Sequence, residues 1–88
     1  MIEKTMTITN KLGMHARPAA QVVQRATKFE AEIKLIKDDI EVNAKSIMGV
    51  MMLAAEMGAK ITIIAVGPDE KEAVEAISQV IQAKFGEE

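Results

Sequence analysis

The sequence predicts an α+β domain of two layers, in which helices cover one face of a sheet and solvent covers the other, with the element order β-α-β-β-α-β-α. Several short segments alternate apolar and other residues, which is typical of strands with one buried face. Longer segments carry an apolar stripe at helical spacing. Because 88 residues that are 49% hydrophobic can fill one small core, we expect a single domain over residues 1–88.

The first part of the chain predicts a strand, a loop and a helix. Met6 and Ile8 alternate with threonines, which is the pattern of a half-buried strand, and Gly13 lies in the loop that follows. Pro18 fits the first turn of a helix that begins near residue 16. The apolar stripe of that helix consists of Ala19, Val22, Val23 and Ala26.

The middle of the chain predicts a hairpin and a short helix. Alternation over 31–35 and 40–42, with two aspartates between them, indicates two neighbouring antiparallel strands. Ser46 suits the N-cap of a short apolar helix, and Gly58 is placed to end that segment.

The last part predicts a fourth strand over 61–65 and a final helix. Asp69 followed by Glu72 resembles a capping box at the start of that helix. Its buried stripe is predicted to consist of Val74, Ile77, Ile81 and Phe85. We expect Glu87 and Glu88 to form a frayed tail without a role.

Composition argues against several classes of function. Eleven Lys and Arg against 13 Asp and Glu give a net charge of −2, so a nucleic-acid binder is not expected. The absence of cysteine excludes disulfides and thiolate metal sites, and one histidine leaves only carboxylates for a metal. No segment predicts a membrane span or a signal peptide. We therefore expect a cytoplasmic monomer with no metal, no cofactor and no membrane insertion.

His15 is the residue that the fold does not require. It lies directly before the first helix, with Arg17 two positions later. A helix N-terminus offers unpaired N–H groups and the positive end of a dipole, and a guanidinium matches phosphate oxygens. A neutral imidazole at this point has a lone pair that can attack a phosphoryl group. The alternative interpretation is a surface histidine or one that caps the helix.

Two motifs resemble those of a known family. The stretch GMHARPA around His15 and the stretch NAKSIMG over Asn43–Gly49 are similar to those of HPr, the histidine-containing phosphocarriers of the bacterial phosphoenolpyruvate-dependent sugar phosphotransferase system. The resemblance covers essentially the whole chain. It implies an open-faced β-sandwich, in which a four-stranded antiparallel sheet of order 1-4-2-3 carries three helices on one face.

The resemblance also implies a function. His15 would accept a phosphoryl group on Nδ1 from the phosphohistidine of Enzyme I and pass it to an enzyme IIA domain, with Arg17 stabilising the phosphoryl group. The protein would then be a covalent carrier within a phosphotransferase relay and not a stand-alone enzyme.

The short helix after Ser46 is apolar nearly all round, so part of it is either buried or a docking surface. Val50 and Leu53 are the candidates for its core side. The resemblance implies that a patch for partner proteins lies beside the histidine and consists of Ile47, Met48 and Met51, continued by Ala16 and Ala20.

Ser46 requires no role beyond helix capping. Its KSIMG context nevertheless resembles the regulatory site that the ATP-dependent HPr kinase/phosphorylase phosphorylates in some members of the family. In those members the phosphoserine form also binds a catabolite-control transcription regulator.

The sequence is also compatible with other functions. A related class with glutamine in place of the histidine serves only in catabolite regulation, and the presence of His15 argues against it. A second possibility is the nitrogen-related branch of phosphocarriers. Identifying which Enzyme I paralogue phosphorylates the protein would distinguish that branch from the sugar branch. A non-catalytic α+β binding module for RNA, a metal or a small ligand is a third, weakened by the lack of sheet aromatics and cysteine.

Overall fold

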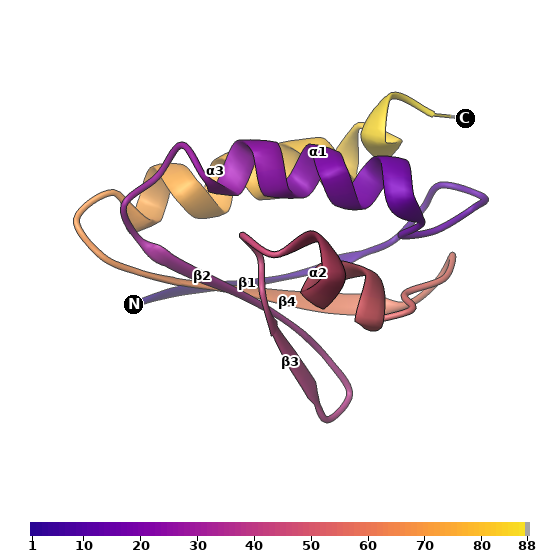
Figure 1. Cartoon of the computed structure of the whole chain (residues 1–88), viewed down its shortest axis with the longest axis horizontal. Coiled ribbons are helices and arrows are strands. Elements are labelled where there is room, and N and C mark those ends of the chain that lie inside the picture. Colours follow the sequence, from indigo (N-terminus) through magenta and orange to yellow (C-terminus); the bar gives the residue numbers. More distant parts are fainter. Residues whose placement is uncertain (88) are drawn as a thin grey trace.

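The computed structural model describes residues 1–87 and has four strands and three α-helices in the predicted order (Figure 1). The sheet is antiparallel at all three junctions and has the order β1-β4-β2-β3, which confirms the predicted fold class. The elements are β1 (Ile2–Thr7), α1 (Ala16–Ala26), β2 (Glu32–Lys37), β3 (Ile40–Asn43), α2 (Ile47–Met52), β4 (Lys60–Val66), α3 (Glu70–Gln82) and a 3₁₀ turn (Lys84–Gly86).

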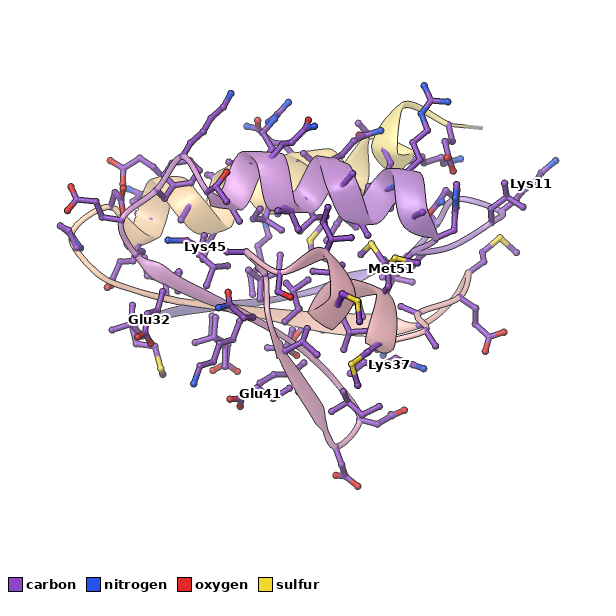
Figure 2. The ribbon with its side chains drawn as sticks, in the orientation of Figure 1. Lys11, Glu32, Lys37, Glu41, Lys45 and Met51 are labelled. Atoms are coloured by element: carbon purple, nitrogen blue, oxygen red, sulfur yellow. The ribbon has the colours of Figure 1, made fainter. Side chains whose placement is uncertain are left out.

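The helices cover one face of the sheet only. Figure 1 shows α1 and α3 lying next to each other over the sheet, and α2 packs against α1 and β3 on the same side. Glu32 and Glu41 point away from the helices, on the open face (Figure 2). Alternating strand residues and one stripe of each helix meet between the layers, and the most deeply buried include Val22, Ile33, Leu35, Val50, Leu53, Ile61, Ile63, Ile77 and Ile81.

Strand β1 begins earlier than the predicted alternation of Met6 and Ile8. It ends at Thr7, so Ile8 lies beyond the strand although its side chain is fully buried. Its backbone instead pairs with the turn before β4, donating to Ala59 O at 2.8 Å and accepting from Gly58 N at 2.8 Å. Ile8 therefore continues the alternation with Met6, one residue beyond the last residue of the strand.

The prediction that Gly58 ends the second helix is wrong. Helix α2 ends at Met52, and Ala54 takes the left-handed conformation just after it, with φ of 49°. The Lys37 ammonium, which approaches from β2, donates to Leu53 O at 3.2 Å and so serves a carbonyl at this helix end. Gly58, with φ of 92°, belongs to the turn into β4.

The capping box predicted for Asp69 and Glu72 is also wrong. The Asp69 side chain makes no cap hydrogen bond. Its two carboxylate oxygens accept instead from the backbone N–H groups of Glu30 and Ala31, both at 2.9 Å. These bonds, that from Glu30 foremost, hold the pKa of the Asp69 carboxyl below its ordinary value. Asp69 thus fastens the start of α3 to the start of β2.

Phe85 is buried as predicted, but it does not belong to the helix. Helix α3 ends at Gln82, and Phe85 lies in the 3₁₀ turn with φ of 57°, its side chain 2% exposed. The Gln21 side chain of α1 donates to Phe85 O at 2.9 Å. The turn therefore folds the chain back toward α1, and it does so at the end of α1 where that helix begins (Figure 1).

Candidate functional site

His15 directly precedes α1, as the sequence predicts, and occupies the N-cap position. Its backbone is extended, with φ of −86° and ψ of −170°, and its carbonyl accepts the first helical hydrogen bond from Ala19 N at 3.0 Å. The imidazole makes no cap hydrogen bond, so it does not occupy the unpaired N–H groups of the first turn. The ring stands at a helix N-terminus without serving as the cap.

The loop before His15 is fixed to the segment between α2 and β4. Met14 N donates to Ala55 O at 2.7 Å. Gly13 has φ of 69°, and a Cβ at this position would lie 2.5 Å from Ala55 O, so only glycine fits. These constraints set where the chain enters α1 and hence where the imidazole stands.

Glu87 is part of this site, contrary to the expectation that it belongs to a frayed tail; Glu88 lies outside the described residues. Oε2 of Glu87 lies 2.9 Å from Nε2 of His15, and Oε1 accepts from Nδ2 of Asn10 at 3.0 Å. The histidine and the glutamate are 72 positions apart in the chain. No local pattern joins them, so sequence reasoning missed both Glu87 and Asn10.

Occupation of Nε2 by a carboxylate leaves the other ring nitrogen open. Within residues 1–87, Nδ1 of His15 has no hydrogen-bond partner, and the side chain is 38% exposed. Arg17, in the first turn of α1, is exposed, and its guanidinium donates to no group in the same part of the chain. The start of α1 thus carries an imidazole with one open nitrogen and, two positions later, an exposed guanidinium.

A surface that we call the methionine patch lies beside the N-terminal end of α1. Figure 2 shows Met51 between α2 and this end of α1. Val50 and Leu53 face the core and are fully buried, as predicted. The patch comprises Ile47, Met48 and Met51, which are 45%, 75% and 44% exposed, with exposed Ala16 and half-buried Ala20.

Ser46 is the N-cap of α2, as predicted, and accepts from Gly49 N at 3.1 Å. It directly precedes the methionine patch. Other exposed apolar side chains that the sequence reasoning did not single out include Leu12, at 73%, and Met52, at 68%.

Among residues 1–87, no three His, Cys, Asp or Glu side chains are grouped as metal ligands would be. None of the helices described is both long and apolar enough for a membrane span.

Known proteins resemble this chain over its full length. The family model described as "PTS HPr component phosphorylation site" matches residues 2–83. Phosphocarrier protein HPr of Treponema pallidum is 50% identical over 88 residues, which are 100% of both chains. A crystal structure of HPr from Thermoanaerobacter tengcongensis has a TM-score of 0.96 and 51% identity, covering 100% of this chain and 99% of that one.

A third similar protein bears on the oligomeric state. The crystal structure of Crh, described as a catabolite repression protein of Bacillus subtilis, has a TM-score of 0.77 and 44% identity over 96% of this chain and 97% of that one. That protein is a dimer with a swapped domain. It counts against the expectation that a chain of this kind is a monomer.

The family model, the full-length identity and the fold agree with one another and with the motifs around His15. The chain therefore belongs to the HPr family, the phosphocarrier proteins of the phosphotransferase system.

Proposed function

We propose that His15 is the phosphoryl acceptor of this carrier and that the group is held on Nδ1. The observation that carries the proposal is the imidazole at the start of α1, with Nε2 facing a carboxylate and Nδ1 open. Arg17 stabilises the phosphoryl oxygens through its guanidinium. Enzyme I is the donor, an enzyme IIA domain is the acceptor, and the relay operates in the cytoplasm.

Each transfer exchanges one N–P bond. The Nδ1 lone pair of His15 forms a bond to phosphorus while the N–P bond of the donor phosphohistidine breaks, and the electron pair returns to the donor nitrogen. In the next transfer the N–P bond of His15 breaks in the same way as the acceptor attacks. The partner's active site supplies the in-line alignment for each step.

The helix N-terminus and Arg17 stabilise the bound phosphoryl group only modestly. A charge at a helix N-terminus is stabilised by about 0.3–2 kcal/mol. A carrier that held its group much more strongly would not release it. The exposed position of Arg17 keeps its contribution in the same range, because solvent screens surface charges.

The proposal is tested by incubating the protein with phosphoenolpyruvate, Mg²⁺ and Enzyme I of the sugar system, followed by mass spectrometry. We expect one acid-labile phosphoryl group, located on His15. An unmodified protein would favour a non-catalytic binding module. Phosphorylation by the nitrogen-related Enzyme I alone would assign the chain to that branch.

The methionine patch is the proposed docking surface for Enzyme I and enzyme IIA. Thioether side chains are flexible enough to fit partners of different shape, and alanines on α1 allow close approach. Replacement of Met51 by lysine should weaken both complexes by about tenfold or more, because a charge would enter an apolar contact. Calorimetric titration with each partner measures the effect.

Ile40→Lys is the matched control for Met51→Lys. Ile40 is 43% exposed, close to the 44% of Met51, but it lies on β3. Its variant should bind both partners as the original protein does. Equal affinities of the two lysine variants would remove the docking role.

We propose that Ser46 is a regulatory phosphorylation site for HPr kinase/phosphorylase and that the phosphoserine form binds a catabolite-control regulator. A phosphate adds about −1.5 to −2 charge next to the methionine patch. Ser46→Asp should therefore fold normally, because aspartate also caps helices, yet accept phosphate from Enzyme I several times more slowly. Ser46→Asn keeps a capping side chain without the charge, and equal rates for the two variants would contradict the switch.

A further inference from the structure

We infer that Glu87 is a positioning residue for His15, whose carboxylate selects the imidazole tautomer with the proton on Nε2 and the lone pair on Nδ1. The inference rests on the proposed function of His15, because it concerns the nitrogen that accepts the phosphoryl group. It is carried by the contact of 2.9 Å between Oε2 of Glu87 and Nε2 of His15. A carboxylate can only accept at that distance, so the ring nitrogen must donate.

Asn10 determines how the glutamate is held. This side chain is fully buried, and its Nδ2 donates both to Gly13 O at 2.8 Å and to Oε1 of Glu87 at 3.0 Å. A backbone carbonyl cannot donate, so the contact with Gly13 fixes which end of the Asn10 amide carries the NH₂ group. Asn10 therefore donates a hydrogen bond to residue 87, and the side chain at position 87 must supply an acceptor.

This arrangement leaves the carbonyl oxygen of the Asn10 amide unsatisfied within residues 1–87. Oδ1 of Asn10 is buried and has no hydrogen-bond partner among the described residues. Both amide protons are used, one on the loop before His15 and one on Glu87, while the carbonyl oxygen is left without a donor. Asn10 thus joins the loop that enters α1 to the segment after the 3₁₀ turn.

Glu87 is shielded enough for these contacts to matter. Its side chain is 17% exposed, against 38% for His15. A partly buried carboxylate interacts with its neighbours more strongly than an exposed one, because less water competes for its oxygens. When Nδ1 forms its bond to phosphorus, the ring retains the Nε2 proton and becomes positively charged, and Oε2 faces that proton throughout.

The isosteric variant Glu87→Gln gives the sharpest test. Asn10 presents an N–H donor, so the glutamine oxygen must turn toward Asn10 and the glutamine NH₂ group toward Nε2 of His15. That NH₂ group would donate to Nε2 and so favour the opposite tautomer, with the proton on Nδ1. We expect Enzyme I to phosphorylate Glu87→Gln about tenfold more slowly. The rate should fall in proportion to the population of the tautomer that has its lone pair on Nδ1.

Two further variants separate this effect from loss of charge or of packing. Glu87→Ala leaves Nε2 without a protein partner, so both tautomers are populated and the rate should fall less than in Glu87→Gln. Glu75→Gln removes the same charge from an exposed position on α3 and should change nothing.

The tautomer is read directly from the ¹⁵N chemical shifts of the imidazole in unphosphorylated protein at about pH 9, where a histidine is neutral. We expect a protonated Nε2 in the original protein and a protonated Nδ1 in Glu87→Gln. Identical ¹⁵N shifts in the two proteins would overturn the inference. Failure of the original protein to be phosphorylated on His15 would overturn the proposed function instead, whatever the shifts.

Discussion

His15→Ala is expected to fold as the original protein does and to accept no phosphoryl group. The imidazole makes no cap hydrogen bond to α1, and the backbone carbonyl that starts the helix remains in the variant. Alanine has no lone pair to attack phosphorus, so the loss of transfer should be complete within detection. The measurement is phosphoryl flow from phosphoenolpyruvate through Enzyme I to an enzyme IIA acceptor.

The fold of this variant is checked independently. Its thermal unfolding should stay within a few degrees of the original protein, since the lost contact is one partly exposed pair with Glu87. Phosphoryl flow to enzyme IIA that persists in His15→Ala would refute the assignment of the acceptor.

Phe85→Ala is expected to lower the free energy of unfolding by about 3–5 kcal/mol, the usual cost of removing a buried phenylalanine ring. The ring is 2% exposed and belongs to the hydrophobic core. Its loss leaves a cavity under the 3₁₀ turn, because the main chain is held there by Gln21. Urea unfolding followed by circular dichroism measures the change.

The only other aromatic residue of the chain provides the comparison. Phe29 is partly buried beside the core, so Phe29→Ala should cost less than Phe85→Ala. If the two substitutions cost the same, Phe85 would not anchor the turn in the way described. A small loss in Phe85→Ala alone would show that the turn closes over the cavity.

The sequence predicts the helices and strands well, because burial of one face of each element makes apolar residues recur at a regular spacing along the chain. Alternation in Ile61 and Ile63, and the stripe through Val22, follow from which side chains meet the core. The position of His15 is also predictable, since Pro18 marks the first turn of a helix and His15 comes just before it. Its proposed role as acceptor rests on the resemblance to the family and on the anion-binding character of a helix N-terminus. The order of the strands in the sheet is predicted by the resemblance to a family. The spacing of apolar residues within each strand does not contain it.

Contacts between distant positions could not be predicted in this way. Asp69 binds the backbone of Glu30 and Ala31 instead of capping its own helix, and Lys37 serves a carbonyl at the end of α2 in place of a terminal glycine. The pairing of Glu87 with His15 is of the same kind. Each depends on which elements the fold brings together, and propensities within a short window do not contain that information.

The imidazole and the methionine patch lie at the same end of α1, which limits how the carrier can work. On the docking surface proposed above, Enzyme I and enzyme IIA would have to take turns, so one copy of the carrier would not bind both at the same time. Turnover then requires each complex to dissociate before the next encounter, which favours brief contacts and micromolar affinities over long residence. Tighter binding to either partner would slow the transfer of phosphoryl groups from Enzyme I to enzyme IIA.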